Sequence, residues 1–115
     1  MKRRDYRDYI QDILDSVNDI DSFLTNITFE QFLKDKKTIN AVVRSIEIIG
    51  EATKKIPASL KGKYPSMPWK KMAGMRDKMI HEYFGIDMEI LWKTAQEDIP
   101  GIKSHLKIIA KNLDI

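Results

Sequence analysis

An arginine, a histidine and a tyrosine occur within eight residues of one another, at Arg76, His81 and Tyr83. Histidine titrates near about pH 6.5, so it can accept or donate a proton close to neutrality. Arginine stays charged and can hold two oxygens of a phosphate while negative charge develops on them. An RNA strand carries its own nucleophile, the 2′-hydroxyl, and needs no metal for cleavage. Arg76 and His81 therefore suit metal-independent phosphodiester cleavage, with no cofactor expected.

The same spacing also has an ordinary structural interpretation, which spacing alone favours. His81 would be a partly buried histidine, Arg76 a surface ion-pair partner and Tyr83 a core residue. On one continuous helix Arg76 and Tyr83 share a stripe, whereas His81 is rotated from Arg76 by roughly 140°. This geometry predicts a cleft that two subunits complete more easily than one. Asp77 or Glu82 would then support the imidazole.

Positive charge is concentrated in residues 54–81. This segment holds eight lysine or arginine residues, Lys78 among them, and one acid, Asp77, which gives it a charge of +7. Because the whole chain carries +3, the remainder carries −4. Such a segment can attract a phosphate backbone, and Lys78 would support that attraction beside the motif. A solvated lysine-rich surface is the alternative that charge alone favours.

Composition excludes several other kinds of site. Cysteine is absent from the 115 residues, which excludes disulfides, thiolate catalysis and cysteine-bound zinc and fits a reducing cytoplasm. The two histidines, His81 and His105, are too few for a histidine-rich metal site. No apolar run approaches the roughly 20 residues that span a bilayer, and the first residues do not resemble a signal peptide. A soluble, cytoplasmic protein without a metal is expected.

Three helices are expected in the first half of the chain, because apolar residues recur there at spacings of three and four. Thr28 and Gln31 fit a capping box for the second helix, and Asp35 is expected to cap the third. Prolines and a glycine after Lys55 predict a loop with one helical turn near residues 58–61. The three helices cover about residues 2–24, 29–34 and 36–55.

The second half is expected to hold two or three further helices, since Gly74 would kink or split the first of them. Gly85 would end that helix in a left-handed conformation, and Asp87 would cap the next. No segment alternates with period two, so no sheet is expected. These helices cover about residues 68–84, residues 88–97 and the stretch that begins near Pro100. The prediction is a single all-α domain over residues 1–115, a bundle of five or six helices built on a long antiparallel pair, the first and third.

The motif and its surroundings resemble one known family. The string Arg76-x-x-x-x-His81-x-Tyr83 is similar to the R-x4-H-x-Y motif of HEPN-domain RNase toxins of the HepT type. The resemblance extends over nearly the whole chain, with one minor departure at Asp77, where the family often has asparagine. Further matching segments are Ala41–Ala52, which ends in Ile-Gly-Glu-Ala, the pair Pro68-Trp69, Gly74-Met75-Arg76 and His81–Asp87.

The resemblance implies a function, a partner and a regulation. Such proteins are homodimeric, metal-independent RNases that act as the toxin of a type VII-like toxin–antitoxin module, with tRNA as one family substrate. Arg76 would stabilise phosphate charge and His81 would transfer protons, in a cleft where the two motif helices meet near the two-fold axis. The implied antitoxin is an MNT-type minimal nucleotidyltransferase that AMPylates Tyr83 from ATP. Neither DNA nor a membrane is expected as a partner.

Two other classes of function also fit the sequence. A non-catalytic subunit could bind nucleotide or substrate for a nucleotidyltransferase partner, using the same arginine, histidine and basic surface without cleavage. A structural helical adaptor would need none of the motif chemistry. Loss of toxicity on His81→Ala and Arg76→Ala would favour the enzyme over both.

Several remaining residues have two interpretations each. Arg44 and Glu47 fit an exposed ion-pair ladder with Glu51, or one of them faces the motif and supports it; the ladder is favoured. A methionine stripe fits a dimer interface or the core of one subunit equally well. Core packing is favoured for the tryptophans, although a base could stack on Trp69. The methionines are Met72, Met75 and Met79. Core packing is favoured for Trp92 as well. For His105 and for the basic cluster Lys2, Arg3, Arg4 and Arg7, solvent exposure without a role is favoured.

Overall fold

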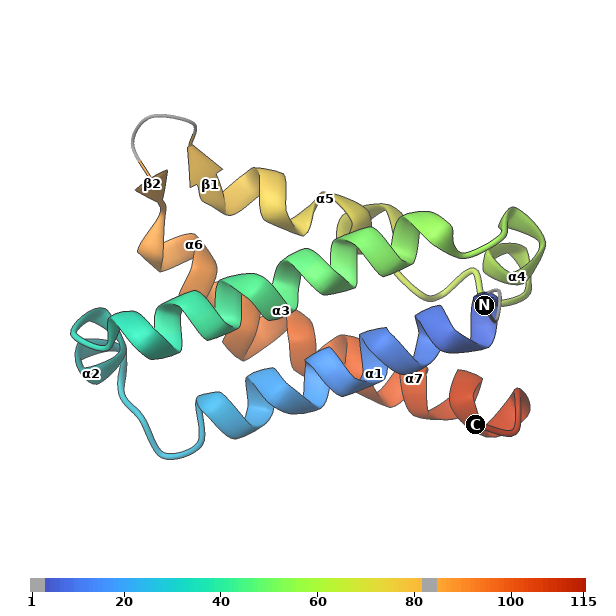
Figure 1. Ribbon diagram of the computed structural model, residues 1–115, viewed down its shortest axis with the longest axis horizontal. Coiled ribbons are helices and arrows are strands. Elements are labelled where there is room, and N and C mark those ends of the chain that lie inside the picture. Colours follow the sequence, from blue (N-terminus) through green and yellow to red (C-terminus); the bar gives the residue numbers. More distant parts are fainter. Residues whose placement is uncertain (1–3, 82–84) are drawn as a thin grey trace.

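Two long antiparallel helices form the centre of the computed structural model, which describes residues 4–81 and 85–115. They are α1 (Tyr6–Phe23) and α3 (Lys36–Lys55), joined through the short helix α2 (Phe29–Leu33). Figure 1 shows α5 (Trp69–Met79) alongside α3, on the side away from α1. This arrangement confirms the predicted all-α class and the predicted pairing of the first and third helices.

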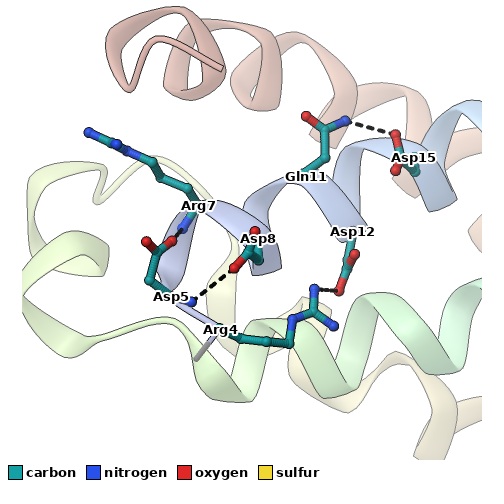
Figure 2. Close-up of polar contacts among 7 residues, drawn as sticks. All are labelled: Arg4, Asp5, Arg7, Asp8, Gln11, Asp12 and Asp15. Carbon is teal, nitrogen blue, oxygen red and sulfur yellow. Dashed lines mark hydrogen bonds and ion pairs between the residues drawn. The ribbon is translucent and has the colours of Figure 1, made fainter. Parts of the chain in front are cut away.

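The first three helices begin at side chains that satisfy their unpaired backbone N–H groups. Asp5 accepts from the N–H of Arg7, and the Asp8 carboxylate accepts from the N–H of Asp5 (Figure 2). The predicted capping box of α2 is confirmed, since Thr28 and Gln31 bond to each other's backbone N–H. The predicted cap of α3 is confirmed too, with Asp35 as the acceptor.

A cluster of buried apolar side chains lies between α1, α3, α5 and the C-terminal helices. The isoleucines of α1 and α3 supply one part of it, and Phe32 of α2 seals one end. The aliphatic positions follow the three-and-four spacing seen in the sequence. The members with no exposed surface are Ile10, Ile13, Val17, Phe32, Val42, Ile46, Ile49, Met72, Met79, Leu91 and Leu106.

Close packing of α3 against α5 depends on Gly50. A β-carbon added there would lie 3.5 Å from the carbonyl oxygen of Ala73 and 3.6 Å from that of Met72. The α5 backbone therefore lies directly against the α3 backbone at this point, and a side chain larger than methyl would separate the helices. The contact fixes which residues of α5 face which residues of α3.

The helix after Pro68 is shorter than its sequence predicts. It ends at Met79 rather than at the predicted Phe84, and it is one continuous helix through Gly74, so the predicted split is absent. The extended strand β1 (Ile80–His81) follows and pairs antiparallel with β2 (Gly85–Ile86), with His81 opposite Gly85. The expectation of no sheet was wrong for this two-residue ladder.

Hairpin hydrogen bonds replace helical ones at this position. The N–H of Asp87 donates to the carbonyl oxygen of Met79 at 2.7 Å, which closes the base of the hairpin. Gly85 has a φ of 80°, the left-handed conformation predicted for it, but it serves the hairpin rather than a helix end. The hairpin leaves no periodic signal in the sequence, because its strands are two residues long and do not alternate.

The C-terminal segment is helical from Met88 to Asn112. It consists of α6 (Met88–Lys93), a π-helical turn η1 (Thr94–Asp98) and α7 (Ile99–Asn112). Asp87 caps it as predicted, but the predicted break before Pro100 is absent. Proline lacks the N–H that a helix interior needs, and the wider π turn accommodates the missing bond.

The predicted turn after Lys55 is the short helix α4 (Ala58–Lys63). Within the described ranges, none of the helices is long and apolar enough to cross a membrane.

Candidate functional site

Arg76 lies in the last turn of α5 and points toward α3. Its Nε donates to Oε2 of Glu47 at 3.2 Å, and the two side chains are 49% and 30% exposed. A guanidinium has five N–H donors. Within the described residues this bond uses one of them, which leaves the two terminal nitrogens to bind an anion. Glu47 thus fixes the direction of the arginine without occupying its whole fork.

A hollow of about 290 Å³ lies beside this ion pair, between α3 and α5. Its floor is formed where Gly50 and Ala73 bring the two backbones together, so small residues create it. Lys54 adds a second positive charge and pairs with Glu51 at 3.7 Å. The lining residues are Glu47, Gly50, Glu51, Lys54, Ala73, Arg76 and Asp77.

The structure places His81 directly after α5, in the first strand of the hairpin. The predicted helical rotation between Arg76 and His81 is therefore wrong, because the helix ends between them at Met79. The stripe predicted to join Arg76 and Tyr83 ends at a residue outside the described ranges. Glu82 and Tyr83 themselves lie outside the described residues, so their predicted roles stay predictions.

The two other motif neighbours are separated by the helix. Asp77 is exposed and lines the hollow beside Arg76, whereas Lys78 is exposed on another face of α5 and lines a different hollow. The structure therefore groups Asp77, but not Lys78, with Arg76. In the described part of the chain, no three acidic or histidine side chains are grouped so as to hold a metal ion.

The structure decides between the two interpretations of Glu47 and Arg44. Glu47 contacts Arg76, so this residue faces the motif, as the less favoured interpretation had it. Arg44 lines a separate hollow of about 200 Å³ between α1 and α3, near Arg4 and Tyr9. The small residues of the Ile-Gly-Glu-Ala segment are the sequence signal that indicates a close contact between helices here. Helical periodicity alone does not identify the residue across it.

The methionine stripe belongs to the core of one subunit. Met72, Met75 and Met79 are 0%, 2% and 0% exposed, so of the two equally favoured interpretations core packing is the observed one. Buried side chains gain from packing within the chain and present no surface to a partner. Both the methionines and the helical rotation therefore cease to support a dimer.

Both tryptophans pack as predicted. Trp69 is 9% exposed, and its Nε1 donates to the carbonyl oxygens of Lys61 and Tyr64. Trp92 packs against Phe29 and Phe32, with ring centroids 5.5 and 5.1 Å apart. These contacts fix α4 and α2 to the helices that follow.

Of the basic N-terminal cluster, the structure describes Arg4 and Arg7, and Lys2 and Arg3 lie outside the described residues. Arg4 forms an ion pair with Asp12 (Figure 2) and lies 4.9 Å from the centre of the Tyr9 ring. Arg7 lies 5.8 Å from the Tyr6 ring centre. His105 is half-buried and lines a hollow formed partly by α7, on a different helix from the motif.

Comparison with known proteins finds close relatives. A model of the family "Ribonuclease HepT-like" matches residues 13–109. A protein of Thermococcus cleftensis named "Probable ribonuclease HepT" is 50% identical over 109 residues, which covers 95% of this chain and 99% of that protein. A protein of Methanocaldococcus jannaschii named as a putative RNase is 46% identical over 114 residues, or 99% of this chain and 94% of that one. No solved structure matches the chain.

Proposed function

Because the chain belongs to the HepT-like ribonuclease family and is an RNA-cleaving enzyme of that kind, we propose that it cuts at the hollow beside Arg76. The observation that carries this placement is the Arg76–Glu47 ion pair at the mouth of that hollow. It presents a directed, permanently charged fork in the turn before the strand that holds His81.

The proposed reaction is internal transesterification. The 2′-oxygen attacks the adjacent phosphorus, the bond to the 5′-oxygen breaks, and the products are a 2′,3′-cyclic phosphate and a 5′-hydroxyl. One proton leaves the 2′-hydroxyl and one reaches the departing 5′-oxygen, and His81 transfers protons in this exchange. Arg76 binds the non-bridging oxygens, where negative charge grows. Donors aimed at developing charge commonly contribute about 10²–10³-fold in rate.

Glu47 is proposed as a positioning residue rather than a catalytic one. It bonds to Arg76 and has no part in the bonds that form or break. Its carboxylate is negative, as is the substrate phosphate, so Glu47 weakens the attraction of phosphate to this site while it fixes the direction of Arg76. The two effects separate in kinetics, because orientation changes kcat and charge repulsion changes KM.

A direct test uses RNA that lacks one 2′-hydroxyl. A single 2′-deoxy substitution at the cut site should abolish cleavage there, because the nucleophile is gone, and chelator should leave cleavage of the normal strand intact. His81→Ala should lose activity on the normal strand. Cleavage of the deoxy strand at an unchanged rate would contradict internal attack by the 2′-oxygen.

We further propose that this enzyme acts as a toxin and is silenced by AMP transfer to Tyr83. The support is the motif resemblance together with family membership. The phenol oxygen would attack the α-phosphorus of ATP, pyrophosphate would leave and the phenolic proton would be lost. Tyr83 is two residues from His81, so the added group would bring bulk and negative charge to the site where RNA phosphate must bind.

Intact mass tests this regulation. Incubation with ATP and the cognate nucleotidyltransferase should add AMP to the wild-type chain and none to Tyr83→Phe, and growth arrest on expression should disappear with transfer. Addition of AMP to the Tyr83→Phe chain would contradict the proposed modification of Tyr83.

A further inference from the structure

Helix α5 borders a second and larger hollow on the face turned away from Arg76. At 100° per residue, Arg76 lies about 160° around the helix from both Gly74 and Lys78. The hollow therefore is not part of the site beside Glu47. It has a volume of about 800 Å³ and is lined by Met67, Pro68, Trp69, Lys70, Lys71, Gly74 and Lys78.

The chemistry of this second hollow is cationic above an apolar floor. Its charged lining residues are three lysines, and no acid is among them. Lys71 pairs with Asp98 at 2.8 Å, while Lys70 and Lys78 are exposed. The buried side chains of Met67 and Trp69 form the floor with Pro68. Such a surface suits an anion that also has a flat apolar part, as a nucleotide has.

Gly74 gives an independent reason to expect a ligand here. A glycine inside a helix costs about 1 kcal/mol relative to alanine. A β-carbon at Gly74 would meet no atom within 4 Å, and its φ is not in the left-handed region. Neither packing nor backbone conformation requires glycine at this position. A side chain there would project into the hollow, so the glycine keeps the hollow open.

A second copy of the chain is a poor occupant. If a two-fold axis passed through this surface, each subunit would set its own lysines against the same lysines of its partner. A polyanion has the complementary charge, and RNA is the polyanion that the proposed function brings to α5. The identity of the ligand thus rests on the proposed function, whereas the site itself rests on the hollow, the lysines and Gly74.

We propose that this hollow is an RNA-binding exosite for an unpaired nucleotide beyond the cleaved bond. Lys70 and Lys78 bind backbone phosphates, and the base rests on the apolar floor at Pro68. A strand held on both faces of α5 is bound more tightly and in a fixed register relative to Arg76.

Binding of a short fluorescent single-stranded RNA to the full chain carrying His81→Ala tests the exosite, because the RNA then stays intact. Adding Lys70→Ala and Lys78→Ala should raise Kd about tenfold or more and reduce the salt slope by about two. The matched control is Lys107→Ala with Lys111→Ala, two exposed lysines of α7, which should change Kd less than about threefold. Equal weakening by both pairs would show only a general effect of charge and overturn the inference.

A second variant tests the hollow rather than its lysines. Gly74→Glu should weaken binding about as much as the lysine pair while the chain melts no lower than the parent. Gly62→Glu is its control, since a β-carbon at Gly62 also meets nothing within 4 Å, and it should retain binding. Unchanged RNA binding by Gly74→Glu would overturn the inference. Lysine variants that bind RNA normally and lose binding only to the nucleotidyltransferase would overturn it too.

Cleavage by the chain with His81 intact separates this inference from the proposed function. Lysine-dependent binding without any cleavage would contradict the proposed function and leave the exosite standing. Persistent cleavage, together with RNA binding that does not depend on Lys70, Lys78 or Gly74, would contradict the exosite and leave the proposed function standing.

Discussion

The ion pair between Arg76 and Glu47 matters for direction more than for stability. Both side chains are substantially exposed, and exposed pairs contribute only about 0–1 kcal/mol to folding. Yet a small displacement of a group that must face a phosphate can cost up to about 100-fold in rate. The positioning role that we propose for Glu47 is therefore one that a stability measurement alone would not detect.

Replacing Glu47 with glutamine tests that role. Glu47→Gln should lower kcat by about 10- to 100-fold, because Arg76 is no longer held by a charged partner. The control is Glu51→Gln, which removes the same charge one helical turn away and should lower KM slightly without reducing kcat. Steady-state cleavage of a labelled RNA measures both. Identical effects of the two substitutions would mean that Glu47 acts only through its charge.

Sequence reasoning identifies the type of chemistry at this scale but not its geometry. The motif spacing singled out Arg76 and His81, and the resemblance gave them roles. The partner of Arg76 is 29 residues away on another helix, and its identity depends on how α3 and α5 pack at Gly50. Periodicity places residues on the faces of their own helix and contains no information on that contact.

Among the elements, the hairpin determines where His81 stands relative to α5. Local signals predicted the beginnings of α2, α3 and α6, because a cap depends on a residue and its neighbours three positions on. The end of α5 was missed, since it depends on pairing between β1 and β2 and on the bond from Asp87 to Met79. A helical pattern continues in the sequence past the point where these bonds end the helix.

Substitution at Gly85 tests the hairpin. Its φ of 80° is unfavourable for a residue with a β-carbon, so Gly85→Ala should destabilise the hairpin by about 1–2 kcal/mol. The cleavage rate should fall by more than the loss of folded protein accounts for, because His81 lies opposite Gly85. Urea unfolding and RNA cleavage measure the two. Gly62→Ala is the control and should not destabilise; equal, unchanged cleavage in both variants would argue against the hairpin's role.

The cap of α3 makes stability depend on pH in a defined way. The Thr38 hydroxyl and then its backbone N–H donate to the Asp35 carboxylate, which lowers the pKa of Asp35 below its usual 3.8. Because the folded-state pKa is depressed, the stabilisation is present above about pH 4 and is lost as pH falls through the folded-state value.

Thermal melting of wild type and Asp35→Ala over pH 2–7 checks this cap. The difference in Tm should be largest near neutrality and shrink below about pH 4, since the protonated carboxyl no longer binds both donors as strongly. A Tm difference that stays constant with pH would show that the carboxylate charge contributes nothing to the cap.

On the scale of the whole molecule, α5 separates two surfaces of different chemistry. One face holds Arg76 beside a mixed-charge hollow, and the other holds the lysine-lined hollow. The concentration of positive charge in residues 54–81 made a polyanion a candidate partner, but it contained no information on how that charge is divided between two faces of α5. That division follows from helical rotation once α5 is packed on α3.

Mixing inactive variants tests the homodimer that the family resemblance implies. If Arg76 of one subunit acts with His81 of the other, equal amounts of Arg76→Ala and His81→Ala should recover about a quarter of wild-type cleavage after subunit exchange. Sedimentation should give twice the 13.4 kDa mass of one chain. No recovery from exchanged dimers would place both groups in the same subunit.

Cleavage of single-stranded RNA by wild type, Arg76→Ala and Arg44→Ala, all in chelator, measures whether Arg76 acts in RNA cleavage. Arg44 is an exposed arginine on α3 that lines a different hollow, so it matches Arg76 in charge and residue type. We expect Arg76→Ala to lower the rate of RNA cleavage by about 10²-fold or more, while Arg44→Ala stays within about threefold of wild type. Equal rates for wild type and Arg76→Ala would contradict this expectation.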